Sequence, residues 1–184
     1  MSAQVERQSV TTPARTGVWV GIAAIVLMVA AFTGALVVRR AQSDWIHFRL
    51  PPIVYVNTLV LLVSSAALER ARGGDLGAAQ QRRWLSITLA LGLLFVVGQV
   101  LAWSNLVAQG LFLATSPSSA FFYVLTALHG VHLLGGVAAL AYVLGRARRA
   151  PLSDAAGALD AAALYWHFLA VLWLYLLLLL TLQL

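Results

Sequence analysis

The sequence has no cysteine in its 184 residues and few charged side chains, since it carries twelve basic residues and six acidic ones. The lack of cysteine excludes disulfides, thiolate metal sites and cysteine nucleophiles. Charged residues make up 10% of the chain, against ~25% in soluble domains. Hydrophobic residues make up 61%, and the mean hydropathy is +0.89. This composition argues against a water-soluble enzyme, a disordered chain or a nucleic-acid-binding module, and it predicts a membrane protein.

Five stretches without charged residues are long enough to span a bilayer, at about 17–38, 51–68, 84–105, 119–145 and 161–184. No Asp, Glu, Lys or Arg occurs between Trp84 and Gly145, so that segment must hold two spans. The turn between them is marked by Asn105 and by Thr115–Ser119, where Ser116 can cap a helix that begins at Pro117. The stretches lack the alternation of barrel strands, so we predict an all-α bundle of five transmembrane helices.

The arginines, which are the only basic residues apart from histidine, set the expected orientation. Nine lie before the first span, after the second or after the fourth, and three lie on the other side: Arg39, Arg40 and Arg49. The positive-inside rule therefore predicts a cytoplasmic N-terminus and an outside C-terminus. We expect residues 1–16 to form a polar cytoplasmic tail and residues 17–184 a single membrane domain. The first apolar stretch is too long for a signal-peptide core and is expected to be retained.

Polar side chains inside the spans are the first candidates for function, because they are costly in hydrocarbon. The second span carries Asn57, Ser64 and Ser65, and the third carries Gln99. Each can make a hydrogen bond between helices, which typically contributes ~0.6 kcal/mol. Each can alternatively belong to a ligand site, and Gln99 could bind a quinone or a neighbouring subunit.

Three histidines also lie within predicted spans, His129 and His132 on one face of the fourth and His167 in the fifth. They admit a metal or haem hypothesis, because neutral imidazole is a common ligand. They equally admit a structural role, because no carboxylate is expected near them to complete or orient such a site. No acid is predicted deep in a span, and we find no Ser–His–acid arrangement or nucleotide-binding glycine loop. The chain is therefore not expected to pump protons alone.

Several motifs occur in an order and spacing that resemble subunit III of cytochrome c oxidase. Residues 121–132 (FFYVLTALHGVH) resemble the family's FF-x-x-T-G-x-H-G-x-H signature. Tyr165–Phe168 (YWHF), followed by Trp173, is similar to its closing YWHF-x-D-x-x-W motif. The remaining matches are Pro51 with Asn57-Thr58 and Ser64-Ser65, then Gly92 with Gln99 and Trp103, and Gly17 with Trp19.

This resemblance implies the last five of the family's seven helices and an accessory, non-redox subunit of a haem-copper terminal oxidase in aerobic respiration. Such a subunit packs on the catalytic subunit I, alongside subunit II, and stabilises it together with bound phospholipid. Haem and copper would lie in the partner subunits, and no catalytic residue is expected in this chain. Arg146 matches a family arginine that contacts lipid phosphate. Trp166 and Trp173 would be structural, as would the polar residues of the spans.

The sequence departs from the family pattern at three positions where acids are usual, which hold Ile25, Ala102 and Ala170. These replacements argue against a proton-uptake role and leave a scaffolding role intact. One alternative is the equivalent subunit of a quinol oxidase or nitric-oxide reductase complex. Another is a free-standing membrane cytochrome or small transporter that uses the histidines. The arginine-only, alanine-rich composition predicts a bacterial plasma membrane location.

Overall fold

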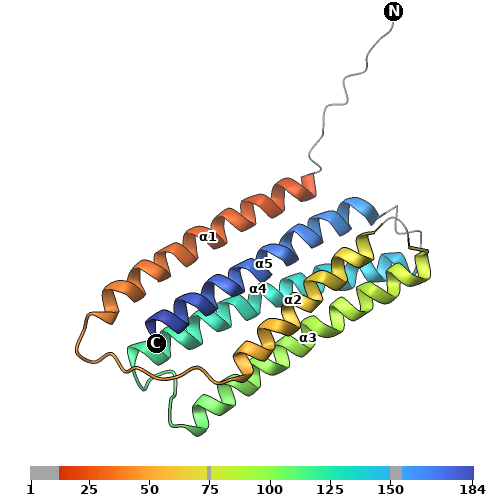
Figure 1. Ribbon diagram of the computed structural model, residues 1–184. Coiled ribbons are helices and arrows are strands. Elements are labelled where there is room, and N and C mark those ends of the chain that lie inside the picture. Colours follow the sequence, from red (N-terminus) through yellow and green to blue (C-terminus); the bar gives the residue numbers. More distant parts are fainter. Residues whose placement is uncertain (1–12, 74–75, 150–154) are drawn as a thin grey trace, which may run out of the picture.

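The computed structural model describes residues 13–73, 76–149 and 155–184, which form an antiparallel bundle of α-helices (Figure 1). The helices are α1 (Pro13–Arg40), α2 (Ile53–Arg72), α3 (Ala78–Ala108), α4 (Pro117–Ala147) and α5 (Ala156–Gln183). No strand occurs in these described ranges. All five helices are long and apolar enough to cross a membrane. The predicted all-α membrane fold with five spans is confirmed.

The helices extend beyond the predicted spans at most of their ends. α3 begins at Ala78, six residues before Trp84, and its first turns include Arg82 and Arg83. α2 continues past Leu68 to Arg72. The predictions stopped short because charge marks the edge of the hydrocarbon, whereas polar residues such as Gln and Arg are good helix formers in water. Most of the predicted tail lies outside the described residues, and α1 already begins at Pro13.

At the turn between α3 and α4, a glycine terminates α3 and a serine caps the start of α4. Gly110 has φ +78°, and the amide of Leu111 reaches back to the carbonyl of Leu106 at 3.0 Å. This is the left-handed ending that glycine favours, and it lies beyond the turn expected at Asn105. The expected cap of α4 is present, because the Ser119 amide donates to Ser116 Oγ at 3.2 Å. Ser119 Oγ in turn accepts from the Ser116 amide at 3.1 Å.

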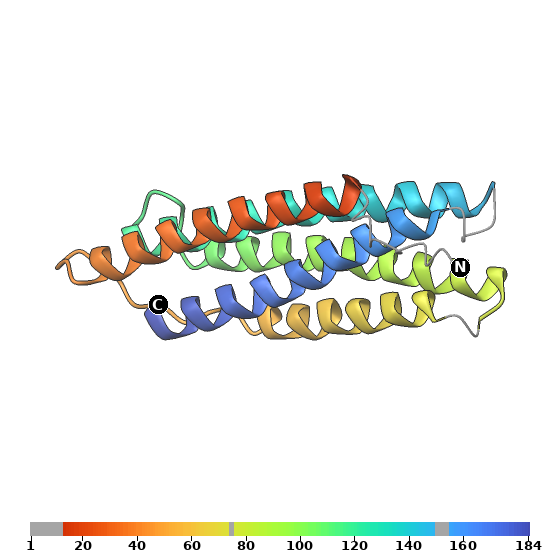
Figure 2. The same cartoon turned by 90° about the horizontal axis from the view of Figure 1, so that it is seen from above.

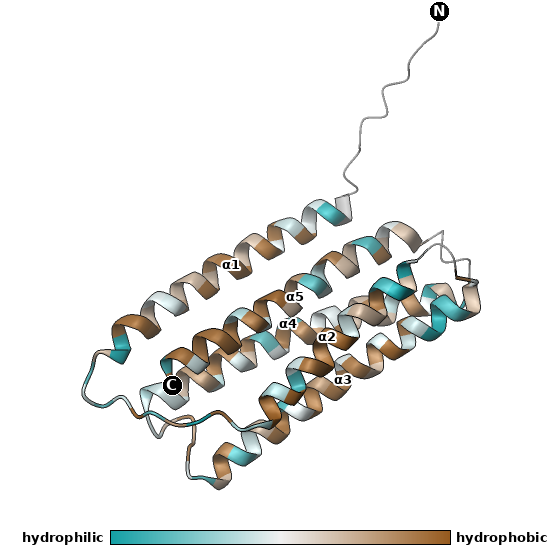
Figure 3. Ribbon diagram, in the orientation of Figure 1, coloured by the Kyte–Doolittle hydropathy of each residue, from teal (hydrophilic) through white to brown (hydrophobic). Residues whose placement is uncertain are grey.

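Helix α5 lies at the centre of the bundle, in contact with α1, α2 and α4 (Figures 1 and 2). Helices α2 and α3 form the most extensive pair, whereas α1 packs against α5 and, to a smaller extent, α4. Hydrophobic residues cover much of the outer surface, and hydrophilic ones gather mostly near the helix ends and the connections (Figure 3). This pattern suits a bundle surrounded by lipid, with its helix ends in the polar layers.

Trp166 of α5, one of the two largest fully buried side chains, fits between glycines of two other helices. A Cβ added at Gly92 of α3 would lie 2.5 Å from Cη2 of the indole, and one added at Gly136 of α4 would lie 3.0 Å from Cε3. Close approach at small residues replaces the hydrophobic effect as the main source of helix association in a membrane. The two glycines therefore set how closely α3 and α4 approach α5.

We expect Gly92→Ala to destabilise the bundle, because the new methyl group overlaps an indole that is buried and has little room to shift. Overpacking of this kind costs about 1–3 kcal/mol. For a chain of this size each kcal/mol lowers the unfolding midpoint by about 2–4 °C. Thermal unfolding in detergent, followed by the near-ultraviolet circular dichroism of tryptophan, measures the shift.

Gly130→Ala on α4 is the matched control, since a Cβ there meets no atom of another helix within 4 Å. Its midpoint should stay the same or rise slightly, because alanine is the better helix former. Equal midpoints for the two variants would contradict the packing described for Trp166.

Candidate functional site: polar side chains between the helices

Two polar residues of α2 make hydrogen bonds to the backbone of α3. The Asn57 amide donates from Nδ2 to the Phe95 carbonyl at 2.9 Å, and Ser64 Oγ donates to the Thr88 carbonyl at 3.0 Å. Both side chains are buried, and Asn57 packs directly against Gly98. The bonds therefore lie two helical turns apart along the same pair of helices and fix how α2 and α3 slide past each other.

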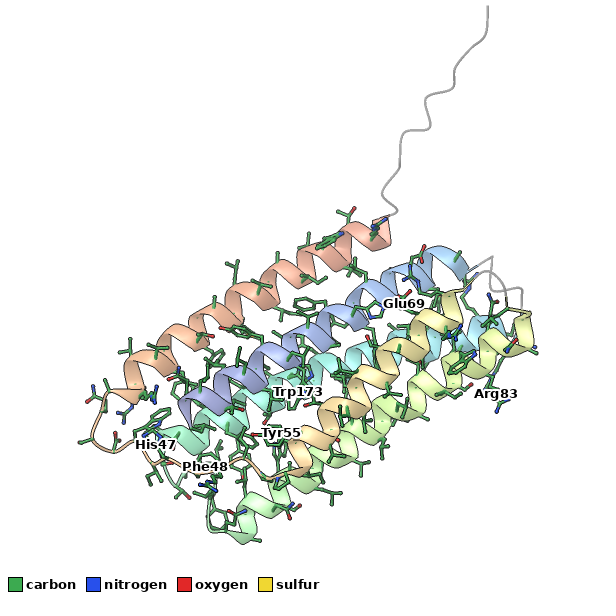
Figure 4. All side chains as sticks on the ribbon, viewed as in Figure 1. His47, Phe48, Tyr55, Glu69, Arg83 and Trp173 are labelled. Carbon is green, nitrogen blue, oxygen red and sulfur yellow. The ribbon has the colours of Figure 1, made fainter. Side chains whose placement is uncertain are left out.

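A second group of residues joins α5 to α2, α3 and α4 near the middle of the bundle, around Trp173 (Figure 4). Trp173 Nε1 donates to Thr58 Oγ1 at 2.9 Å. Its indole packs edge-on to Phe95, with ring centroids 4.9 Å apart, and is tilted against the His129 ring at 5.0 Å. Phe95 and His129 also contact each other, with centroids 5.8 Å apart. The imidazole of His129 thus serves as one ring of an aromatic cluster.

Buried polar atoms without a partner occur at three sequence-predicted positions. Within the described ranges, both side-chain amide atoms of Gln99, both ring nitrogens of His129 and Nε1 of Trp166 lack a hydrogen-bond partner. His132, one turn from His129, bonds through Nδ1 to the Leu128 carbonyl at 2.7 Å. A carbonyl only accepts, so the proton of a neutral His132 ring lies on Nδ1 and Nε2 is an acceptor. The two histidines line one small cavity of about 10 Å³.

His167 lies apart from that pair, in a row of hydrogen bonds between α2 and α5. Its Nδ1 lies 2.5 Å from Ser65 Oγ, and its Nε2 lies 2.5 Å from Glu69 Oε1. Arg72 donates to the same carboxylate at 2.6 Å and to Asp160 of α5 at 2.9 Å. In a neutral His167, Nε2–H donates to Glu69 and Nδ1 accepts from the Ser65 hydroxyl. We call these five side chains the His167 cluster.

The prediction that no carboxylate orients a membrane histidine is wrong for His167, and so is the prediction of no Ser–His–acid arrangement. Glu69 is 98 residues from His167 in the sequence, and only the rotation of α2 and α5 about their axes brings them together. One signal was available, because Ser65 and Glu69 are four residues apart and so share a helix face. The expectation failed because it placed Glu69 at a span end without considering which helix it faces.

The arrangement of the His167 cluster favours a structural link over catalysis. Ser65 lies within the continuous helix 53–72, so the backbone amides around it donate within α2 and cannot stabilise an oxyanion. Within the described ranges, no three His, Cys, Asp or Glu side chains are grouped closely enough to hold a metal ion. What the cluster does is join α2 to α5 at one end of the bundle.

Arg146 lies at the same end, exposed in the last turn of α4. It donates to the hydroxyl of Tyr142 at 3.3 Å. Tyr142 in turn lines a groove of about 560 Å³ between α1, α4 and α5. The groove walls are mostly small and apolar, including Gly17, Gly21 and Gly135. The Arg146 guanidinium is therefore hydrogen-bonded to a residue in the wall of an apolar groove.

The three positions that lack the family's acids all lie in the protein interior. Ile25, Ala102 and Ala170 are each less than a tenth exposed. A carboxylate at any of them would need a buried partner to offset its desolvation. The apolar residues found there contribute instead to the packing of the core.

We expect Glu69→Ala to destabilise the bundle by about 1 kcal/mol, because the His167 and Arg72 donors lose their shared acceptor at a half-exposed site. Thermal unfolding in detergent should show a midpoint lower by about 2–4 °C. Asp44→Ala is the control, since it removes an exposed ion pair made five residues away with Arg39. A control shift as large as that of Glu69→Ala would show that the link between α2 and α5 has no special weight.

Comparison with known proteins connects these features to a family. A family model described as "Cytochrome c oxidase subunit III" matches residues 46–182, which include α2 to α4 and all but the last residue of α5, but not α1. A probable cytochrome c oxidase subunit 3 from Mycobacterium leprae is 35% identical over 150 residues, covering 73% of this chain and 70% of that protein. A Corynebacterium diphtheriae cytochrome c oxidase subunit 3 is 33% identical over 133 residues, covering 70% of this chain and 64% of that protein.

A more distant bacterial relative matches a longer part of the chain. The cytochrome c oxidase subunit 3 of a Synechocystis species is 30% identical over 165 residues, covering 84% of this chain and 69% of its own length. The chain thus spans between about three fifths and three quarters of the length of the relatives it matches. With the five apolar helices and the motifs of α2 to α5, these matches show that this multi-pass membrane protein belongs to the cytochrome c oxidase subunit III family.

Proposed function

We propose that the chain is an accessory, non-redox subunit III of a haem-copper terminal oxidase, which packs on the catalytic subunit I and stabilises it. The observation that carries this proposal is the family match over residues 46–182. The relatives are named as cytochrome c oxidase subunits, which favours cytochrome c over quinol as the electron donor of the oxidase. Their bacterial origin favours the plasma membrane as the location, with the N-terminus in the cytoplasm as the arginine distribution predicts.

The use of the polar side chains supports a scaffolding role. Asn57, Ser64 and Trp173 each bond to another helix of the same chain, and both ring nitrogens of His167 are engaged by Ser65 and Glu69. Axial ligation of a haem by His167 would require one of its bonds to break. His167 is therefore disfavoured as a haem ligand, whereas both ring nitrogens of His129 lack a hydrogen-bond partner within the described ranges.

The outer faces of the bundle support packing against other membrane components. Large apolar side chains are exposed along α2 and α3, among them Val56, Leu59, Leu94 and Val97. In a membrane such faces contact lipid or other helices. Part of this surface would contact subunit I and the rest would contact phospholipid, while haem and copper belong to the partner subunits.

The groove between α1, α4 and α5 is the proposed phospholipid site. Its apolar walls suit acyl chains, and Arg146 lies beyond Tyr142 where a phosphate would reach the polar layer. The position of this arginine at a helix end, together with the groove beside it, supports lipid binding.

Affinity purification of the tagged chain from its native membrane tests the oxidase assignment. We expect a haem-bearing protein identified as subunit I to co-purify in a 1:1 ratio, and the complex to reduce oxygen with reduced cytochrome c. After dissociation, the haem absorbance should remain entirely with the partner. A stable homo-oligomer of this chain that carries its own haem would refute the proposal.

Arg146→Gln tests the lipid role, with Arg83→Gln as a control of equal charge change at the same end of the bundle. Loss of one arginine contact should weaken retention of anionic phospholipid about fivefold. Native mass spectrometry of the chain in detergent measures the retained lipid. Equal losses in both variants would indicate general charge attraction instead of a site beside the groove.

A further inference from the structure

The end of the bundle opposite Arg146 has a second cavity, of about 540 Å³, formed where the segment 41–52 passes from α1 to α2. His47, Phe48 and Arg49 from this segment line it, together with Tyr55 of α2 and Leu180 of α5. Figure 4 shows His47 and Phe48 on this segment and Tyr55 near the start of α2, at the end of the bundle where α5 terminates. The volume lies in the usual range for small-molecule sites, about 300–1,000 Å³.

Hydrogen bonds to other parts of the bundle hold this segment in place. Trp45 Nε1 donates to the Gln183 carbonyl at 3.1 Å, and His47 Nδ1 bonds to the Leu184 carbonyl at 2.9 Å. From α4, Ser118 Oγ donates to the Ile46 carbonyl at 2.6 Å. The cavity wall is therefore pre-organised, and two carbonyls at the negative end of α5 are already satisfied by donors of the segment.

The charges at this end leave one arginine available at the cavity. Arg39 is paired with Asp44, and its guanidinium holds the pKa of that carboxyl below the usual value, so that Asp44 stays ionised to a lower pH than a free aspartate. Arg40 donates to Gln183 at 2.9 Å. Within the described residues, neither Arg49 nor the hydroxyl of Tyr55 has a hydrogen-bond partner, and Asp44 is the only acidic side chain at this end. The carboxyl group of Leu184, which accepts from His47, also lines the cavity.

The cavity thus combines a guanidinium, an imidazole and a phenol with apolar walls from Phe48 and Leu180. The α2 helix also begins here without an acidic residue in its first turn or a side-chain cap, which adds a weak positive potential. Arginine recognises phosphate through paired N–H donors, and apolar walls favour an acyl chain. Trp45 and Tyr55 are of the type that gathers at the membrane–water boundary.

We propose that this cavity binds one anionic phospholipid of the leaflet on this side, with its phosphate at Arg49 and Tyr55 and its chain along Leu180. The site lies at the opposite end of the bundle from the groove beside Arg146 and would belong to the other leaflet. The apolar wall and the position at the ends of two spanning helices favour a lipid over a free anion. This inference depends on the membrane fold and not on the oxidase assignment.

Lipid titration of the full chain tests the proposal, with dioleoyl phosphatidylglycerol as the probe and native mass spectrometry as the readout. We expect the half-saturating lipid concentration to rise about fivefold in Arg49→Gln. It should rise less in Arg49→Lys, which keeps the charge but loses the paired N–H donors. It should change little in Arg83→Gln, the control at the opposite end. Circular dichroism checks that each variant is folded. Tyr55→Phe, which removes only the hydroxyl, provides an independent test, and we expect it to bind the lipid more weakly.

Three outcomes would overturn the proposal. Equal effects of Arg49→Gln and Arg83→Gln would show attraction to net charge alone. Displacement of the lipid by inorganic phosphate, with phosphate bound in its place, would show a site for a free anion. A lipid lost in Arg146→Gln but retained in Arg49→Gln and Tyr55→Phe would assign the bound molecule entirely to the other groove.

Discussion

The close packing of Trp166 between Gly92 and Gly136 is the contact on which the rest of the bundle depends. In hydrocarbon there is little hydrophobic gain in bringing helices together, so association relies on complementary surfaces and on hydrogen bonds between helices. A large flat ring against two glycines provides such a surface where α3, α4 and α5 meet. It also places Trp173, two turns further along α5, where its indole reaches Thr58 on α2 and packs on Phe95 and His129.

Polar side chains of α2 reinforce this packing through hydrogen bonds to α3 and to α5. Asn57 and Ser64 join α2 to α3, whereas Ser65 and Glu69, on another face of α2, bind His167 of α5. Helix α2 is thus held on two sides by residues of a single short segment. For a subunit proposed to brace a catalytic neighbour, such internal connections keep the outer apolar faces in a constant shape.

Much of the fold could be predicted from the sequence, because its signals are local. Apolar length identified all five spans, and Ser116 before Pro117 identified the start of α4. The helix ends were less predictable, since an arginine marks the membrane boundary and not the end of a helix. The bond between His167 and Glu69 and the cavity beside Arg49 were not foreseen, because they depend on how distant helices are rotated and on the path of one connecting segment.

The distribution of ionisable groups follows from the apolar surroundings of the helices, in which a buried charge is costly. The interior positions of Ile25, Ala102 and Ala170 hold apolar residues, while the described acids lie within about three turns of a helix end or in a connection. A buried carboxylate would require a matched cation at the same depth, and such pairs often add less stability than apolar packing of equal volume. Glu69 avoids this cost because its partners Arg72 and His167 are themselves partly exposed near the membrane edge. Ionic contacts at the ends and apolar packing between them suit the scaffold role proposed for the chain.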